Sequence, residues 1–408
     1  MKTLDEVEPR TPIAQADVPL TILQSGSYYL TENLAANAIG LSAVISIAAE
    51  DVHLDLMGFS IEGSNEVAQA DHCIELDAFS DGSVIRNGTV YGALFAGIDG
   101  DFGAIGVTVE DIVSRNNSGR GIQVGAYGVV RRCTVFSNTQ VGIETSTDAM
   151  VVSCTVNANG RGVLTGRASV IRDVTANDNG LYGIFTSVDC VLENVTAWSN
   201  DGVGIETSFG CTISRAVAAF NTGDGIKVDA FCVIATSASR SNGGDGFAMG
   251  IGSSITDSEA SSNTGNGIDG AQGSLVRACT ASSNSFAGIR VDDDSSVIDC
   301  VARFNDTNGI QGDHRTMIRG NACAQNGDAG AGAGIRVTGD DGRVEGNMCS
   351  FNVKWGISIG GTDNLIARNS CANNGAGLAD NYTFAGGNEV GTEVNTPVGA
   401  GAWDNISH

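Results

Sequence analysis

The residues best able to do chemistry are cations set among carboxylates in the second half of the sequence. The cationic candidates are Lys227, Arg290, His314, Arg315 and Arg336, and the acidic candidates are Glu206, Asp229, Asp269, Asp292 and Asp313. Arginine can neutralise the carboxylate of an acidic sugar, and lysine or histidine can remove the adjacent proton. The set therefore fits β-elimination on a uronate-containing polysaccharide. A ladder of solvated ion pairs is the alternative interpretation of the same residues.

The hypothesis gives each candidate a role. Lys227 or His314 is expected to act as the base, because both side chains can accept a proton. Arg290, Arg315 and Arg336 are expected to neutralise the uronate carboxylate. The five acidic residues are expected to contact the substrate.

A repeated glycine sets the positions of these residues. All but three of its intervals are 21 residues, and an Asn lies four residues before most copies. The copies are Gly121, Gly142, Gly162, Gly183, Gly204, Gly225, Gly246, Gly267, Gly288, Gly309, Gly334 and Gly356. A fixed period of this length indicates a repeat architecture.

Each repeat reads as three short strands. An apolar, a variable and a second apolar residue follow the glycine, as in GIQV, GIKV and GIRV, and this period of two is typical of a strand. Further apolar pairs predict two more strands, which leaves no room for a helix. The pattern predicts an all-β, single-stranded parallel β-helix of about 15 coils. We expect the coils over residues 41–374, with caps over 1–40 and 375–408.

Stacked coils bring equivalent residues about 4.8 Å apart, which gives the repeated residues structural roles. The Asn is expected to form a hydrogen-bonded ladder at a corner, where it and the glycine tolerate left-handed backbone. Interior columns are expected at Ser241, Ser262 and Ser283, at Phe220, Phe304 and Phe351, and at Asn321, Asn347 and Asn369. The variable residue after Gly-Ile should face outward, so the cations and carboxylates should form a vertical band.

The cysteines follow the same period. There are eleven, none in a CxxC pair, and several are 21 apart, such as Cys133 and Cys154 or Cys279 and Cys300. An odd number without metal-type spacing disfavours a zinc site and a complete disulfide framework. Stacked, buried free thiols are the favoured interpretation, with disulfides as the alternative.

Charge limits the partners of the chain. The formal net charge is -25, which disfavours nucleic acid as a partner of the whole molecule. No apolar run is long enough to span a membrane, and the first residues are too polar for a secretory signal. No cofactor is expected. Ca²⁺ at Asp292, Asp293 and Asp294 or at Asp340 and Asp341 is an alternative, since calcium takes several oxygen ligands.

Two further features bear on a sugar-binding surface. The insertion GDAGAGAG at 327–334 lengthens one coil next to Arg336, and it is either a groove wall or a harmless turn expansion. Aromatic residues that can stack on sugars are Tyr182, Phe185, Phe286 and Trp355.

The chain resembles a known group of bacterial proteins over essentially its whole length. GSYYLTENL, VHLDLMGFSIEG and NYTFAGGNEVG, together with the Asn-Gly-Ile coils, look like right-handed parallel β-helix repeat proteins of the pectin-lyase-like superfamily. That resemblance implies a right-handed fold, and characterised members of the superfamily include polysaccharide lyases, glycoside hydrolases, uronate epimerases, adhesins and tailspikes.

We therefore expect an extracellular or cell-surface protein whose partner is a polysaccharide or oligosaccharide. A polysaccharide lyase or a related uronate-acting enzyme is the first hypothesis. A non-catalytic carbohydrate-binding, adhesive or structural β-helix is the alternative. Fold alone does not choose between them.

Overall fold

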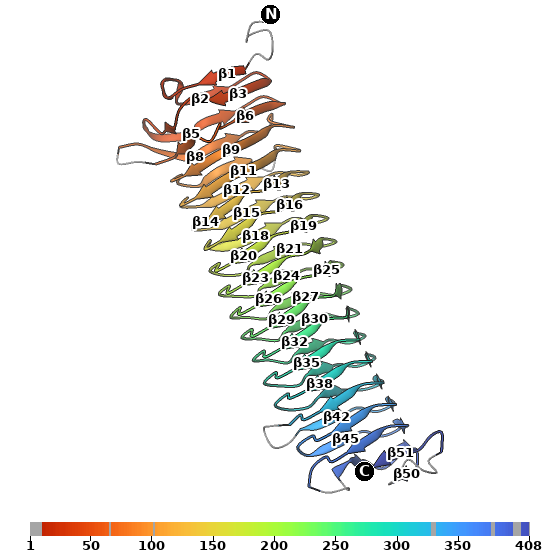
Figure 1. The fold of residues 1–408 in the computed structure, drawn as a ribbon. Coiled ribbons are helices and arrows are strands. Elements are labelled where there is room, and N and C mark those ends of the chain that lie inside the picture. The colour runs from red at the N-terminus through yellow and green to blue at the C-terminus, as the bar shows by residue number, and fades with distance from the viewer. Residues whose placement is uncertain are drawn as a thin grey trace, which may run out of the picture. The chain divides into compact units, whose positions relative to one another are not determined.

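The chain forms two compact units, residues 1–202 and 203–408. The computed structural model describes residues 10–64, 67–100, 103–327, 332–376, 380–394 and 401–407. Each unit is a stack of β coils that pair in parallel (Figure 1). The two units contain about 18 turns between them, and no α-helix occurs in the described ranges.

A typical coil contains three strands, as the repeat predicts. In one coil of residues 203–408 these are β24 (Ile205–Thr207), β25 (Thr212–Ser214) and β26 (Val217–Ala219). We call sheet B the sheet formed by the strands that follow the repeated glycine, and sheet A the sheet formed by the other two strands of each coil. Each strand pairs with its equivalent in the next coil, so β24 pairs with β27 (Ile226–Val228).

Residues 1–202 begin with strands that already pair in parallel. Sheet B contains β2 (Leu20–Ile22), β5 (Ile39–Ile47), β8 (Gln69–Leu76), β10 (Ala96–Gly100), β12 (Arg120–Val124), β15 (Val141–Thr145), β18 (Arg161–Thr165) and β21 (Ile184–Thr186). Sheet A contains β1 (Arg10–Ile13), β3 (Gly26–Leu30), β4 (Leu34–Ala35), β6 (Val52–Asp55), β7 (Ser60–Glu62), β9 (Val84–Tyr91), β11 (Thr108–Arg115), β13 (Val129–Arg131), β14 (Thr134–Phe136), β16 (Met150–Val152), β17 (Thr155–Asn157), β19 (Val170–Arg172), β20 (Thr175–Asn177), β22 (Val191–Glu193) and β23 (Thr196–Trp198). A single 3₁₀ turn, η2 (Gln15–Asp17), lies among the described residues of this unit.

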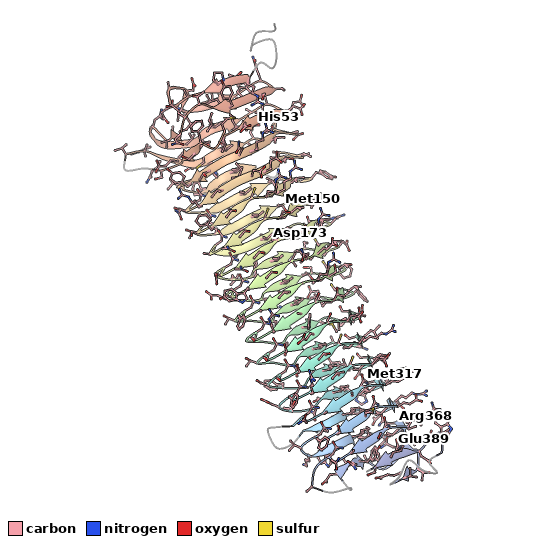
Figure 2. The ribbon with its side chains drawn as sticks, viewed as in Figure 1. His53, Met150, Asp173, Met317, Arg368 and Glu389 are labelled. Carbon is pink, nitrogen blue, oxygen red and sulfur yellow. The ribbon has the colours of Figure 1, made fainter. Side chains whose placement is uncertain are left out.

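Residues 203–408 continue the same pattern. Besides β24 and β27, sheet B contains β30 (Phe247–Met249), β33 (Ile268–Gly270), β36 (Ile289–Val291), β39 (Ile310–Gly312), β42 (Ala333–Val337), β45 (Trp355–Ile359) and β48 (Tyr382–Phe384). Besides β25 and β26, sheet A contains β28 (Val233–Ala235), β29 (Ala238–Arg240), β31 (Ser254–Thr256), β32 (Glu259–Ser261), β34 (Leu275–Arg277), β35 (Thr280–Ser282), β37 (Ser296–Ile298), β38 (Val301–Arg303), β40 (Met317–Arg319), β41 (Ala322–Ala324), β43 (Arg343–Glu345), β44 (Met348–Ser350), β46 (Leu365–Ala367), β47 (Ser370–Ala372), β49 (Glu389–Val390), β50 (Glu393–Val394) and β51 (Asn405–Ser407). Met317 of β40 and Arg368, which follows β46, lie on the sheet A side of the coils in this unit (Figure 2).

The coil count is higher than the sequence predicts, about 18 rather than 15. The extra turns lie where the 21-residue period fails. At the N-terminal end β1 already pairs with β3, and β2 pairs with β5. These coils differ in length, so their repeat is not visible as a fixed spacing.

The core is built from small aliphatic side chains stacked in columns. In sheet B the inward residues are mostly Ile and Val, such as Ile226 and Ile268, which are fully buried. Phe247 is the one aromatic side chain among the largest fully buried residues. A coil this narrow has no room for larger rings in every turn, which explains why only 6% of residues are aromatic.

A ladder of buried asparagines runs along one corner of each unit, as predicted. The backbone N and the Nδ2 of Asn263 both donate to Oδ1 of Asn284 at 3.0 Å, and Nδ2 also donates to the Ser239 carbonyl at 3.2 Å. The ladder comprises Asn117, Asn138, Asn159, Asn179 and Asn200 in the first unit, and Asn221, Asn242, Asn263, Asn284, Asn305, Asn326, Asn352, Asn374 and Asn381 in the second. Each rung satisfies backbone groups that would otherwise be buried without partners.

The prediction assigned left-handed backbone at the corner to the Asn and the glycine, but a different residue adopts it. Positive φ belongs to the residue before the Asn, for example Ser262 at 58°. The repeated glycine is needed instead for close approach: a Cβ on Gly246 would lie 2.5 Å from the Gly267 carbonyl oxygen and 2.6 Å from Nδ2 of Asn263.

The prediction of two interior columns at this position was therefore wrong. It concerned Ser241, Ser262 and Ser283, and Phe220, Phe304 and Phe351. All six have positive φ at the corner, and the three Phe side chains are 54%, 48% and 60% exposed. The left-handed residue turns the chain before the ladder, so its side chain faces outward.

The thiols follow the stacking interpretation. All eleven cysteines are buried thiols. The Cys279 amide contacts Sγ of Cys300 at 3.5 Å, and the Cys300 amide donates to Oδ1 of Asn321 at 2.8 Å. A second Asn ladder continues this column through Asn321, Asn347, Asn369 and Asn405, which confirms three of its predicted members.

Candidate functional site

The outward column of sheet B in residues 203–408 carries half of the predicted charged residues. Strand register places the following residues in vertical succession: Glu206, Lys227, Ala248, Asp269, Arg290, Gln311, Arg336 and Ser358. This is the column that the repeat predicts. The side chains of this column differ in charge and polarity because they face outward and do not pack in the core.

Lys227 forms an ion pair at the start of this column. Its Nζ lies 2.9 Å from Oε1 of Glu206 on the preceding strand. That hydrogen bond raises the pKa of Lys227 above its ordinary value. The ammonium is thus held protonated, which is the wrong state for a base.

Arg290 is held between two carboxylates. Its Nη1 lies 2.7 Å from Asp269 on the neighbouring strand, and its Nη2 lies 2.7 Å from Asp292 on its own chain segment. Burial lowers the pKa of Arg290, but the two carboxylates outweigh burial, so the net shift is upward. The guanidinium is fixed in place and stays charged.

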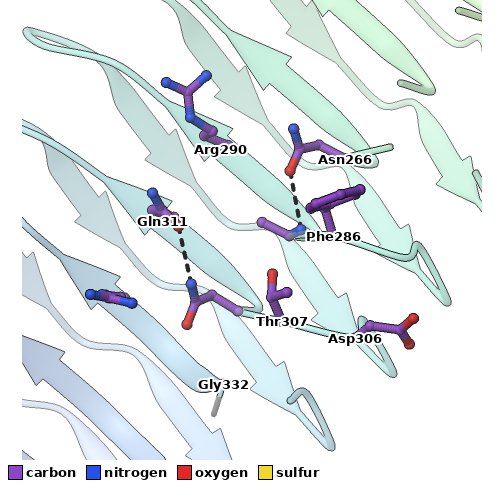
Figure 3. A pocket seen from close by; sticks show the side chains of 10 residues that line it. Asn266, Phe286, Arg290, Asp306, Thr307, Gln311 and Gly332 are labelled. Carbon is purple, nitrogen blue, oxygen red and sulfur yellow. Dashed lines mark hydrogen bonds between the residues drawn. The ribbon is translucent and has the colours of Figure 1, made fainter. Parts of the chain in front are cut away.

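A pocket of about 370 Å³ lies between Arg290 and Arg336. Gln311 lies between the two arginines in the strand register. One wall is the Phe286 side chain, which is 56% exposed, and the turn at Asp306 and Thr307 forms part of the rim (Figure 3). The pocket lining therefore combines two arginines and one aspartate with an aromatic ring.

Arg336 is the cation in this pocket without a carboxylate partner. Its side chain is exposed, and no acidic group among the described residues forms an ion pair with it. Thr307, Asn308 and Gln311 supply uncharged polar groups to the same pocket. A guanidinium in this setting can bind a carboxylate through two parallel N–H bonds.

The polar groups beside the arginines are held by hydrogen bonds. Asn308 Nδ2 donates to Oε1 of Gln311 at 3.1 Å, and Oδ1 of Asn266 accepts from the Ala287 amide at 3.1 Å (Figure 3). The Asn308 Oδ1 accepts from the Ala333 amide. These bonds orient the Gln311 amide so that its Nε2 remains available to a ligand.

His314 and Arg315 lie at the corner after β39, outside the outward column. The Asp340 amide donates to Nδ1 of His314 at 3.0 Å. Since Nδ1 accepts, the neutral ring carries its proton on Nε2. His314 can therefore donate a hydrogen bond from Nε2, but in this arrangement it has no free lone pair to act as a base.

Arg315 is engaged by the acidic turn of the preceding coil. Its Nε and Nη2 donate to Asp294, and Nη2 also lies 3.4 Å from Asp293. The guanidinium lowers the pKa of Asp294 to about 2. This pair behaves as the surface ion-pair alternative describes.

A metal ligand set is also present at this corner. Ligand atoms of Asp293, Asp313 and His314 lie within 4.8 Å of one another. Asp293 lies in the acidic turn where the sequence suggests Ca²⁺, but Asp292 and Asp294 are bound to Arg290 and Arg315. The imidazole makes the set less suited to calcium, which prefers oxygen.

The other predicted features fall in different places. Asp229 is exposed beside the first part of the column. Trp355 begins β45, the strand of sheet B that pairs with the strand of Arg336, and Nζ of Lys354 lies 4.0 Å from the centroid of its ring. Tyr182 and Phe185 pair with each other in residues 1–202, with ring centroids 5.4 Å apart. Of the insertion at 327–334, residues 328–331 lie outside the described residues, and Gly332 lines the pocket.

Sequence reasoning missed the turn residues of the pocket. Thr307 and Asn308 follow the ladder residue Asn305 and are not among the candidates named from the sequence. The signal that could have found them is the Asn three residues before Gln311, which reaches its amide.

No helix among the described residues has the length and apolarity that crossing a bilayer requires.

The coiled architecture and its repeat define a parallel β-helix protein. The chain belongs to the right handed beta helix region family, whose model matches residues 58–205 and 201–332. No curated protein matches the sequence.

Solved structures of similar fold share little sequence with this chain. It is 16% identical to the A-module of the mannuronan C-5 epimerase AlgE4 of Azotobacter vinelandii, with a TM-score of 0.44 over 82% of this chain and 88% of that chain. It is 13% identical to the pectate lyase Pel9A, with a TM-score of 0.41 over 63% of this chain and 80% of that chain. It is 12% identical to the tailspike of E. coli bacteriophage HK620, with a TM-score of 0.40 over 82% of this chain and 72% of that chain. These likenesses concern the fold.

Proposed function

We propose that residues 203–408 bind an acidic polysaccharide at the pocket between Arg290 and Arg336. The observation that carries the proposal is Arg336, an exposed guanidinium with no carboxylate partner among the described residues, beside the exposed Phe286 ring. A uronate carboxylate would pair with Arg336, and its sugar ring would stack on Phe286.

The ion-pair alternative explains only part of the column. Three of the cations already form ion pairs within the protein and need no ligand. These pairs are Lys227 with Glu206, Arg290 with Asp269 and Arg315 with Asp294. Among the residues that the structure describes, Arg336 is left over from that pairing. In a protein of net charge -25, an arginine in a pocket that pairs with no described carboxylate favours an anionic ligand.

A uronate lyase or related enzyme is the second candidate, and the two arginines at one pocket favour it. Neutralising a uronate carboxylate lowers the cost of removing the neighbouring proton. The base is the weak part of this candidate, because Lys227 is held protonated and Nδ1 of His314 already accepts a hydrogen bond. Binding without chemistry is thus the function that the geometry supports best.

The test is affinity electrophoresis through gels that contain alginate, pectate or hyaluronan. Wild-type protein should be retarded by at least one of them, and Arg336→Ala should lower the association constant about tenfold or more, the usual cost of losing a charge-assisted pair. Arg319→Ala is the matched control, because it removes an exposed arginine from β40 of sheet A. High salt should weaken binding of the wild type, because it screens the pair between Arg336 and the carboxylate.

Two results would contradict binding at this pocket: no retardation in any of the acidic gels, or equal retardation of Arg336→Ala and wild type. Ultraviolet absorbance of unsaturated uronate on the same polysaccharides separates the second candidate. Its appearance with wild type, and its loss in Arg336→Ala, would favour the lyase.

A further inference from the structure

A second pocket in residues 203–408 lies at the corner that carries the Asn ladder. Its volume is about 300 Å³, and it is lined by Phe304, Gln325, Phe351 and Val353. None of these side chains carries a charge. The two phenylalanines and the valine are about half exposed or more, at 48%, 60% and 48%.

The two rings occupy the left-handed corner position of their coils. Phe304 and Phe351 have φ of 57° and 56°, the left-handed region, in the residue just before a ladder Asn. The same position has positive φ in other coils too, with small residues at Ser262 and Ser283 and a third ring at Phe220. Left-handed backbone is therefore the regular geometry of this corner, and what sets Phe304 and Phe351 apart is that both rings line one pocket.

Burial in the core does not explain why phenylalanine occupies these two positions. A phenylalanine normally stabilises a fold by removing its ring from water, yet both rings remain about half exposed. They therefore contribute little to the core of this unit. Two exposed rings that line the same pocket indicate a role outside folding, whereas the exposed ring of Phe220 lines no such pocket with them.

Gln325 lies between the rings in the same column. It has a positive φ of 56°, its side chain is exposed, and its side-chain amide forms no hydrogen bond with any described residue. Equivalent residues two coils apart are about 10 Å apart, so the pocket presents a ring, an amide and a second ring along the stacking direction.

We propose that this pocket binds an uncharged polysaccharide, with sugar rings stacked on Phe304 and Phe351 and hydroxyl groups hydrogen-bonded to Gln325. A pyranose has an apolar C–H face for the rings and hydroxyls for the amide, so one ligand satisfies both features. A docked hydrophobic protein surface would leave the Gln325 amide buried without a partner, which is costly. The lack of charged lining separates this site from the one at Arg336.

The experiment uses the full chain in gels that contain xyloglucan, galactomannan or laminarin. Wild type should be retarded by at least one of these neutral polysaccharides. Phe304→Ala/Phe351→Ala should lower its association constant about tenfold or more, whereas Phe304→Tyr/Phe351→Tyr should retain binding. Phe220→Ala is the matched control, because Phe220 is an exposed Phe at the same left-handed position outside the pocket.

Circular dichroism and the melting temperature of each variant establish that it is folded, and the Tyr pair keeps the test decisive where the Ala pair unfolds. The proposal is overturned if no neutral polysaccharide retards the wild type, or if the Ala pair binds as well as the wild type. It is also overturned if sedimentation shows a dimer that the Ala pair disperses. Arg336→Ala should leave neutral binding unchanged, so this result is independent of the acidic-polysaccharide proposal.

Discussion

The carboxylate of Asp245 occupies a place where a charge is poorly tolerated. It lies just before the repeated Gly246, where its Oδ1 accepts from the Asn266 amide. Burial raises its pKa to about 6, and the nearby carboxylates of Asp269 and Asp224 add to the rise. The folded protein therefore binds this proton more tightly than the unfolded chain does.

This shift predicts how stability depends on pH. Between about pH 4 and pH 6 the folded state holds more protons at Asp245 than the unfolded state, so the free energy of unfolding should fall as pH rises through this window. Asp245→Asn keeps the Oδ1 acceptor and removes the charge. It should raise the melting temperature at pH 7 and flatten the decline between pH 4 and 6, as measured by circular dichroism.

The control for this experiment is Asp257→Asn, which removes an exposed carboxylate from the same unit. That variant should keep the decline of the wild type. An unchanged pH profile in Asp245→Asn would show that burial of Asp245 does not contribute to stability as described.

The ladder asparagines give a second residue-scale prediction. Asn263 donates to Asn284 and Ser239, and its Oδ1 accepts from Asn242. Replacing it by Ala leaves several buried groups without partners, at about 1–3 kcal/mol each. Asn263→Ala should lower the free energy of unfolding by about 3 kcal/mol or more in urea titrations. Thr264→Ala, at the exposed next position, should have little effect, and equal losses would contradict the structural role of the ladder.

At the scale of elements, the repeated glycine determines how closely the corner approaches sheet B. A Cβ on Gly246 would lie within 2.6 Å of both the Gly267 carbonyl oxygen and Nδ2 of Asn263. Moving Nδ2 of Asn263 would break a rung of the ladder, and moving the Gly267 carbonyl would break its hydrogen bond from the Phe247 amide. The strand after the glycine and the corner before it thus depend on one another.

Gly246→Ala should therefore be strongly destabilising, by about 2 kcal/mol or more, because the new methyl group overlaps backbone atoms. Gly386→Ala is the control, since a Cβ there meets nothing within 4 Å and its φ is not positive. It should be neutral or slightly stabilising. Thermal unfolding of both variants measures the difference, and comparable melting temperatures would refute the close-approach explanation.

The elements show which parts of the fold the sequence could predict. Where coils have 21 residues, the spacing alone predicted the strands and most ladder residues. Asn159, Asn326 and Asn374 were missed because coil lengths next to them differ from 21. The orientation of Phe304 was also missed, since it depends on a left-handed residue that the pattern of apolar residues does not reveal.

At the scale of the whole molecule, the site was predictable only as a column. Arg290, Gln311 and Arg336 were expected in succession, and the register agrees. Which cations are paired could not be read from spacing, because it depends on the direction each long side chain takes from its strand. Pairing of Arg290 and Arg315, and the lack of a partner for Arg336 among the described residues, required side-chain positions.

The molecular charge sets the conditions under which an acidic ligand can bind. With a net charge of -25, long-range repulsion slows the approach of any polyanion, while Arg336 attracts its carboxylate only at short range. A polyanion should thus associate slowly at low ionic strength. Moderate salt screens the long-range repulsion between the protein and the polyanion. The close pair between Arg336 and a carboxylate in the pocket is weakened only at higher salt.

Because most coils begin and end at equivalent residues, the gene for such a chain can change by whole repeats. Because strands pair in register and each ladder rung is made the same way, removing or duplicating one full 21-residue segment, such as 243–263, leaves every junction chemically equivalent. The chain can therefore lengthen or shorten by whole coils through recombination between its own repeats. Surface specificity can then diversify one coil at a time, with the interior unaffected.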